Sequence, residues 1–470
     1  MSLDHGQLEA AIRRDDVTGV RDLLRTATEA DRRAAARALR DLLRGPRLEL
    51  PQPVMVSSPD QLLRLMMSHQ HDHHHPSPRE REWDEWRKVA GGAAFLAARL
   101  GLAGGVAQAI KIVEDHTSER ELPEAEFDAV AGVLADRRPD WLADFVDRRL
   151  TAEWSFGIDC WLLARRLVRL GAIARPDVAQ YTVMMPARLW HVSWHDEEHS
   201  LRLGTTPAQA LLADPELLED EVWRLFTVPD VGRELERMDR DRVLTSDGVE
   251  VTGAWADSLA WLSEQGHLDR GRLLDATLDA FSRDFAPNRV AWYAAFHDRL
   301  APTLDEMAAR AGRYLGLLAV GAKPGVSLGQ RGCGTLLDAG RLAHGEFLAA
   351  SGPALLFPQK SVATAQLRLV ARVASRQPEI RASALATAAQ GFGHQREDVQ
   401  EAAVALLARH GLPGGPEQAE ILAQSAALSP VLAPAAAALG LTPPAAEPCP
   451  VLVVPAQPDP APGDPMPPVE

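Results

Sequence analysis

The segment LDRGRLLDATLDAFSRDFAPNRVAWYAAFHDRLAPTLDEMAARAGRYLGLL, residues 268–318, decides the fold class of this chain. Its large apolar residues recur three or four positions apart, the spacing of one face of an amphipathic helix. Three such stripes follow one another, broken at Ala286-Pro287-Asn288 and at Pro302: Leu274, Leu278, Phe281 and Phe285; Tyr293, Phe296 and Leu300; then Leu304, Met307, Ala311, Leu315 and Leu318. The segment therefore predicts short, successive helices with little chain between them.

Helix pairs of this kind recur through much of the chain. They begin near residues 253, 288, 324, 358 and 396, so successive starts lie 35, 36, 34 and 38 residues apart. A period in this range is typical of stacked helical repeats, in which neighbouring hairpins cover each other's apolar faces. The signature of tetratricopeptide repeats is missing, and the Ala- and Leu-rich pairs around Pro378 favour HEAT-type units. We predict an all-α fold, a right-handed α-solenoid of HEAT-like helical hairpins with irregular insertions and a disordered Pro-rich C-terminal tail.

The pattern changes along the chain and suggests six segments. Asp247-Gly248 is a two-residue turn signal and indicates a small hairpin. The tail carries 11 prolines among residues 443–470, which excludes helix there. The segments are a helical hairpin region at 1–44, a Pro/His-rich loop or linker at 45–82, helical repeats at 83–185, an irregular insertion with one helix and a possible hairpin at 186–252, the HEAT-like array at 253–440 and the tail at 441–470.

Composition narrows the classes of function. The chain has 470 residues, of which 46 % are apolar, and a formal net charge of −15. No long span is basic, so a nucleic-acid partner is not expected, and neither is an anionic membrane. The three cysteines, Cys160, Cys333 and Cys449, form no CxxC pattern and suit a reducing compartment. The first residues lack the features of a signal peptide, and no run of 18 apolar residues occurs. We therefore expect a cytoplasmic protein.

Several blocks of the sequence resemble a known family. These are VWRLF at 222–226, LDRGRLLDATLDAFSRDF at 268–285, NRVAWYAAFHDRLAPTLDE at 288–306 and REDVQEAAVALLARHG at 396–411. They are similar to an actinobacterial family of uncharacterised proteins, labelled as a domain of unknown function, with HEAT-like C-terminal repeats. The resemblance covers roughly residues 85–410 and is strongest after residue 220. It implies the helical-repeat fold and brings no catalytic or binding residue with it.

The string His195-Asp196-Glu197-Glu198-His199 fits the H-x-x-E-H pattern of inverted zinc proteases. On a helix, His195 and His199 would share a face and could bind Zn²⁺, with Glu198 as the base toward a metal-bound water. Such a site needs a third ligand, for which Glu264 is a candidate. The alternative interpretation is a polar loop between helices, anchored by Trp190 and Trp194.

A second histidine-rich stretch comprises His69, His71 and His73–His75. Its imidazoles could coordinate Ni²⁺, Zn²⁺ or Cu²⁺. A histidine tract flanked by prolines more often binds metals adventitiously, so both interpretations stay open.

The chain has 11 tryptophans beside 3 tyrosines. Trp141, Trp161, Trp255 and Trp292 occupy stripe positions and are expected in the core. Trp83 and Trp86 follow the histidine-rich stretch, where an exposed aromatic residue would anchor a partner. They are the candidate partner-binding residues.

Cys333 lies between two glycines and could act as a nucleophile, but no neighbouring residue in the sequence is placed to activate it. A buried thiol is the simpler interpretation. The glycine-rich segments near Lys323 and Gln330 lack the spacing of a phosphate-binding loop.

The leading hypothesis is a non-enzymatic scaffold or adaptor that binds another protein or peptide and needs no cofactor. The alternative from another class is a zinc-dependent hydrolase that uses His195, Glu198 and His199. A helical-repeat DNA-binding protein is a third option, which the charge disfavours.

Overall fold

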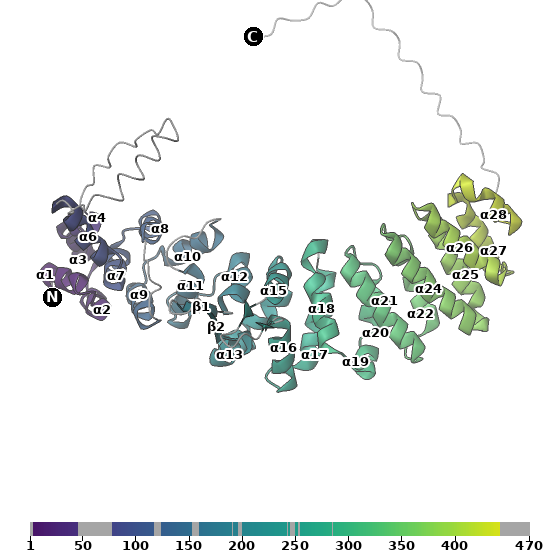
Figure 1. Ribbon diagram of the computed structural model, residues 1–470, viewed down its shortest axis with the longest axis horizontal. Helices are drawn as coiled ribbons and strands as arrows, with labels where there is room; N and C mark the ends of the chain where they lie inside the picture. Colours follow the sequence, from purple (N-terminus) through teal and green to yellow (C-terminus); the bar gives the residue numbers. More distant parts are fainter. Residues whose placement is uncertain are drawn as a thin grey trace, which may run out of the picture. The chain divides into compact units, whose positions relative to one another are not determined.

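The computed structural model describes residues 3–45, 78–116, 124–152, 159–189, 191–195, 200–241, 243–244, 250–251, 254–283 and 285–441. Helices dominate these residues, as the sequence predicts (Figure 1). The chain divides into two compact units, residues 1–276 (unit 1) and 277–470 (unit 2). This division falls inside helix α17 (Arg270–Asp279), whereas the array was expected to begin at residue 253. No helix within the described ranges is long and apolar enough to cross a membrane.

Unit 1 contains short helices and two hairpins. In chain order its elements are α1 (His5–Arg13), α2 (Val17–Arg25), α3 (Glu29–Ala38), α4 (Arg40–Arg44), α6 (Pro78–Ala90), α7 (Ala93–Leu102), α8 (Val106–Asp115), α9 (Glu124–Arg137), α10 (Leu142–Thr151), α11 (Cys160–Arg169), α12 (Ala179–Leu189), β1 (His191–His195), β2 (Ser200–Thr205), α13 (Pro207–Ala213), α14 (Pro215–Glu219), η1 (Glu221–Phe226), α15 (Val231–Arg240), β3 (Val243–Leu244), β4 (Glu250–Val251) and α16 (Ala254–Glu264).

The first helices begin where the sequence places capping residues. The Asp16 side chain accepts a hydrogen bond from the backbone N–H of Gly19 at 2.8 Å and starts α2. Thr28 and Asp31 form a reciprocal capping box at the start of α3. Arg32, which is 3 % exposed, then donates to the carbonyl oxygens of Leu24 at 2.6 Å and Gly101 at 2.9 Å. A buried arginine thus satisfies carbonyl groups at the ends of α2 and α7.

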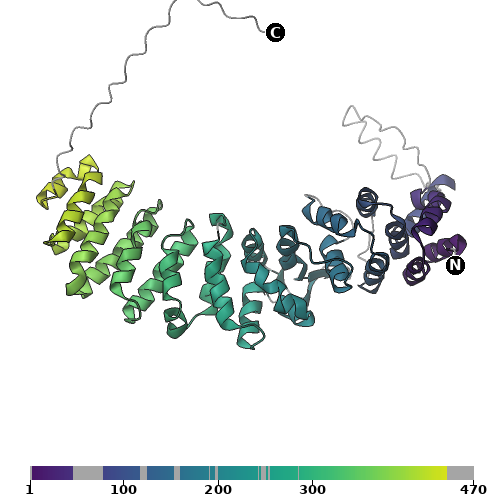
Figure 2. The same ribbon diagram turned by 180° about the vertical axis from the view of Figure 1, so that it is seen from behind.

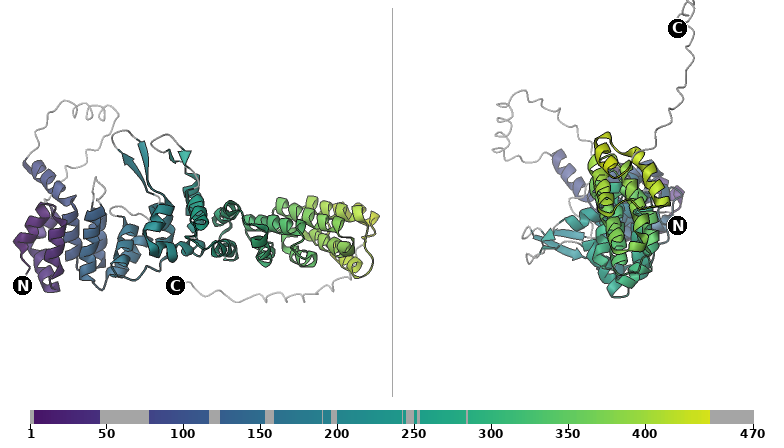
Figure 3. Two further views of the ribbon diagram at one scale, coloured as in Figure 1. Left: turned by 90° about the horizontal axis from the view of Figure 1, so that it is seen from below. Right: turned by 90° about the vertical axis from the view of Figure 1, so that its right-hand side faces the viewer.

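The segment 186–252 contains more helices and strands than the one helix and possible hairpin expected there. Thr206 and Gln209 form a capping box that starts α13, and α14 and α15 follow. On either side of the predicted turn, β3 pairs antiparallel with β4, while Asp247-Gly248 itself lies outside the described residues. A second hairpin, in which β1 pairs antiparallel with β2, was not predicted. Both hairpins project from the helices of unit 1 (Figure 3).

Unit 2 continues with helices throughout its described part. Its elements are η2 (Ala280–Ser282), η3 (Pro287–Arg289), α18 (Ala291–Leu300), α19 (Leu304–Ala308), α20 (Ala311–Leu317), α21 (Lys323–Asp338), α22 (His344–Ala350), α23 (Gly352–Leu355), α24 (Lys360–Arg376), η4 (Pro378–Ile380), α25 (Arg381–Ala389), η5 (Gln390–Gly393), α26 (Glu397–His410), α27 (Pro416–Gln424), η6 (Ser425–Ala427), η7 (Pro430–Leu432) and α28 (Ala433–Ala438).

Most of the apolar stripes in residues 268–318 are buried as predicted. Tyr293 and Phe296 have no exposed surface, and Leu300 is 4 % exposed. The third stripe is buried only in part: Met307 is 9 % exposed and Leu318 has no exposed surface, but Leu304 is 38 % exposed. The helix expected there is interrupted at Ala309-Arg310 between α19 and α20, and beyond the interruption Tyr314 and Leu317 are also buried.

Neighbouring helices of unit 2 are joined by a series of exposed ion pairs, here called the Asp–Arg rungs. Their partners lie 33 to 36 residues apart in the sequence, which matches the helical period. The rungs join Asp298 to Arg331 at 2.8 Å, Asp305 to Arg341 at 2.9 Å, Asp338 to Arg372 at 2.8 Å, and Asp279 to Arg313. Within unit 2, helices α18 to α28 accordingly follow one another side by side in chain order (Figures 1 and 2).

Candidate functional site

Trp83 and Trp86 lie on one face of α6, because residues three positions apart are neighbours on a helix. Their rings stack with centroids 5.0 Å apart, and the edge of Trp86 meets Phe95 of α7 at 5.9 Å. The indole N–H of Trp86 donates to the carbonyl oxygen of Leu42 at 2.8 Å. Trp86 is therefore fixed against two other helices, and Trp83 extends the aromatic surface outward.

Gly45 makes this arrangement possible. Its φ of +75° ends α4 in a conformation that favours glycine, and a Cβ atom at this position would overlap the Trp86 ring. The chain can thus turn closely beneath the tryptophan.

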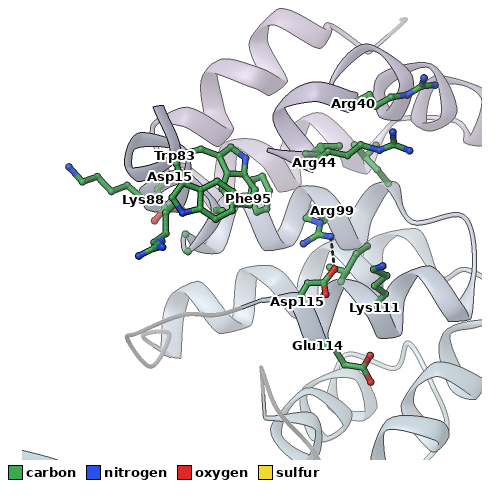
Figure 4. A pocket seen from close by; sticks show the side chains of 18 of the residues that line it. Asp15, Arg40, Arg44, Trp83, Lys88, Phe95, Arg99, Lys111, Glu114 and Asp115 are labelled. Carbon is green, nitrogen blue, oxygen red and sulfur yellow. Dashed lines mark ion pairs between the residues drawn. The ribbon is translucent and has the colours of Figure 1, made fainter. Parts of the chain in front are cut away.

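The two tryptophans line an open cavity of about 1490 Å³ in unit 1, here called the Trp83–Trp86 groove (Figure 4). Helices α3, α4, α6, α7 and α8 all contribute to its walls. Its aromatic and charged lining residues are Asp15, Arg40, Arg44, Trp83, Asp84, Trp86, Arg87, Lys88, Phe95, Arg99, Lys111, Glu114 and Asp115.

The carboxylates of the groove are mostly engaged. Asp15 accepts a hydrogen bond from the backbone N–H of Ala94 at 2.9 Å. Asp115 pairs with Arg99 at 3.6 Å, and Glu114 pairs with the buried Arg149 at 3.0 Å. Asp84 is the remaining lining carboxylate.

The cations of the groove are mostly not engaged. Within the part of the chain that the structure describes, Arg40, Arg44, Lys88 and Lys111 have no carboxylate partner, and all four are exposed. Arg87 lies over the Trp83 ring, 5.9 Å from its centroid. The groove therefore presents an aromatic surface with uncompensated positive charge on a protein whose formal net charge is −15.

A second cluster of polar groups is buried between α11, α12 and η1. Arg165 pairs with Asp214 at 2.6 Å and with Glu216 at 2.9 Å. Burial raises the pKa of Tyr181 to about 12 and raises that of Glu221 above its ordinary value. Tyr181 has no exposed surface and Glu221 is 2 % exposed, so neither meets a solvent-borne substrate in this conformation. We interpret the cluster as structural.

Of the three residues in the predicted zinc motif, the structure describes only His195. His195 is the last residue of β1 and pairs with Ser200 of β2, so the helical spacing assumed for the motif does not hold at His195. Glu198 and His199 lie outside the described residues, as does Trp190. Over the described ranges, no three His, Cys, Asp or Glu side chains converge in a way that could hold a metal ion. A metal role for His195 and His199 stays a prediction.

The histidine-rich stretch His69–His75 also lies outside the described residues, as does the predicted Pro-rich tail from residue 442 onward. Cys333 is described and has no exposed surface. Burial raises the pKa of its thiol to about 12, so almost no reactive thiolate forms near neutral pH. Trp161, Trp255 and Trp292 are buried as predicted, with Trp141 only partly buried.

The site residues that sequence reasoning missed are the basic groups around the tryptophans. Arg87 and Lys88 follow Trp86 directly and could have been included with it. Arg40, Arg44 and Lys111 come from α4 and α8, and only the tertiary packing brings them to α6.

These features define a class, namely helical proteins with an aromatic and basic groove on one of their units. A family model described as a domain of unknown function (DUF6493) matches residues 106–360, and the chain belongs to this family. No curated protein and no solved structure matches the chain. Most of the groove lies before the matched region, which begins at α8.

Proposed function

We propose that the protein is a non-enzymatic scaffold or adaptor whose groove binds another protein or peptide. In this proposal its helices form a right-handed α-solenoid of HEAT-like hairpins. The Asp–Arg rungs support the solenoid, because ion pairs recur between neighbouring helices at the 33- to 36-residue spacing of such repeats. The free thiols of Cys160 and Cys333 support a cytoplasmic location.

The observation that carries the proposal is the combination of stacked tryptophans and unpaired cations in the Trp83–Trp86 groove. Interfaces are enriched in tryptophan and arginine because both provide contact area and directional bonds. A side-chain cation without a partner can bind an anionic ligand without first breaking an ion pair within the protein. The groove therefore fits a partner that offers apolar rings or side chains together with carboxylates.

The test is affinity capture with the full chain from cells that produce it, followed by quantitative mass spectrometry. We expect a stoichiometric partner that wild type retains and the variant Arg44→Glu loses. Arg233→Glu is the matched control, because Arg233 is also exposed and has no carboxylate partner among the described residues but lies on α15, outside the groove. The proposal fails if no stoichiometric protein is recovered, or if both variants retain it equally.

A further inference from the structure

The Trp83–Trp86 groove has two chemical requirements for its occupant. The exposed edge of the tryptophan stack needs flat or compact apolar groups, and prolines meet this need in aromatic-lined grooves. The unpaired cations Arg40, Arg44, Lys88 and Lys111 need carboxylates. An acidic, proline-rich segment satisfies both.

The chain itself carries such a segment. Residues 443–470 read PPAAEPCPVLVVPAQPDPAPGDPMPPVE, with 11 prolines. The carboxylates of the segment are Glu447, Asp459, Asp464 and Glu470, and it contains no Lys, Arg or His. Proline fixes the backbone φ before binding, so such a segment loses less conformational entropy when it binds than an ordinary chain does.

We propose that the Trp83–Trp86 groove binds residues 443–470 of this chain, either in the same molecule or in a second copy. The proposal rests on the proposed function, since it names the peptide that the groove recognises. In it, prolines contact Trp83 and the carboxylates pair with the cations around the groove. The tail then competes with other acidic, proline-rich partners for the same groove.

The charge distribution favours this occupant over a nucleic acid. Asp84, Glu114 and Asp115 stand among the cations that line the groove. A nucleic-acid backbone carries a charge at every phosphate and would meet these carboxylates as well. A peptide with only four carboxylates among residues 443–470 can place its neutral prolines there instead.

The experiment uses the full chain and its third cysteine. Cys160 and Cys333 are buried, so Cys449 offers the position for a dye that tryptophan quenches on contact. Mass spectrometry verifies that a single label is attached. We expect quenched emission that recovers by more than about half in Trp83→Leu, because the aromatic surface is lost. Trp261→Leu is the matched control, since Trp261 is 43 % exposed on α16, away from the groove.

Charge variants keep the test meaningful if Trp83→Leu disturbs the fold. Lys88→Glu replaces an attraction with a repulsion at an exposed position, and we expect it to weaken the contact about fivefold or more. Replacing the four tail acids by amides, or adding about 1 M salt, should also relieve the quenching. Dilution distinguishes a tail bound to the groove of its own molecule from a tail bound to a second copy, because quenching within one molecule is independent of protein concentration.

Two results overturn the inference. One is emission that neither Trp83→Leu nor Lys88→Glu changes relative to the Trp261→Leu control. The other is a labelled single-stranded oligonucleotide that binds in a Lys88-dependent manner while the tail remains unquenched. The proposed function survives both results if affinity capture still recovers a groove-dependent protein, so the two failures are distinguishable.

Discussion

Tyr314 shows how a single side chain fixes the packing of two helices in unit 2. Its hydroxyl lies 2.8 Å from Nε2 of His297 on α18, and both side chains are buried. Its ring lies where a Cβ atom on Gly332 of α21 would be. Glycine at this position lets α20 and α21 approach closely.

Gly332→Ala should therefore destabilise the protein, by about 1–3 kcal/mol, because the added methyl group overlaps the buried Tyr314 ring. Gly316→Ala on α20 is the control, since a Cβ atom there meets nothing within 4 Å. Alanine is the better helix former, so this control should stabilise by up to about 1 kcal/mol. Denaturant unfolding measures both, and equal stability of the two variants would contradict the packing described.

His297 should make the stability depend on pH. Burial lowers the pKa of His297 below its ordinary value of 6.5, and Arg331 and Arg310 act in the same direction against Asp298. As the pH falls, the unfolded chain takes up the proton first, so stability present above pH 6.5 is lost as the pH drops below it. Between roughly pH 7.5 and 5.5, His297→Gln should lose less unfolding free energy than wild type. An equal loss would show that His297 is not the titrating group, whatever His116 contributes.

At the scale of elements, a buried amide network joins α21, α22 and α24. Gln366 has no exposed surface and donates to the hydroxyl of Ser351 at 2.8 Å. Its amide oxygen also accepts a hydrogen bond from the side-chain amide of Gln330 at 3.2 Å. The same Gln330 amide donates to the carbonyl oxygen of Val362 at 2.9 Å. The bonds of Gln330 join α21 to α24, as the rung between Asp338 and Arg372 does.

The two kinds of connection should differ in energy. Gln366→Ala should cost about 2–4 kcal/mol, because it leaves a cavity and deprives buried polar groups of their partner. Arg331→Ala breaks the exposed rung to Asp298 and should cost less than about 1 kcal/mol. Chemical denaturation of the two variants gives the comparison. A larger effect for Arg331→Ala would mean that the rungs, and not the buried amides, hold the helices together.

The helices of this chain could be predicted from their apolar spacing, and the exceptions have local causes. The break between α19 and α20 lacks Gly or Pro, so nothing in the sequence marks it. The hairpin of β1 and β2 did carry a signal, since Val192 and Trp194 alternate with polar residues and so do Leu201 and Leu203. The histidines and acids beside that alternation suggested a helical metal motif instead.

Only the two tryptophans of the groove could be predicted from the sequence. Trp83 and Trp86 stood out as a helical pair of large aromatic residues. Their charged surroundings come mainly from three other helices, α4, α7 and α8, and no periodicity links those helices to α6. The net charge of −15 also concealed a local excess of unpaired cations, because a total says nothing about where the charges lie.

At the scale of the whole molecule, metal content separates the scaffold from the hydrolase. Untagged full-length protein, dialysed against a chelator and analysed for elements, should hold well below one equivalent of zinc. A ligand set of His195, His199 and a third side chain would retain the metal instead. In that case, loss of the zinc in His195→Ala but not in a variant without His69–His75 would support the hydrolase.

The Asp–Arg rungs bear on how chains of this family change in length. Each rung joins one helix pair to the next and reaches no farther, so an insertion or deletion between its two partners changes which residues face each other. We therefore expect changes in whole steps of roughly 35 residues to be tolerated better than other lengths, because they keep complete helix pairs stacked on each other. Relatives whose lengths differ within unit 2 should then differ in their number of helix pairs, which a comparison of their sequences would show.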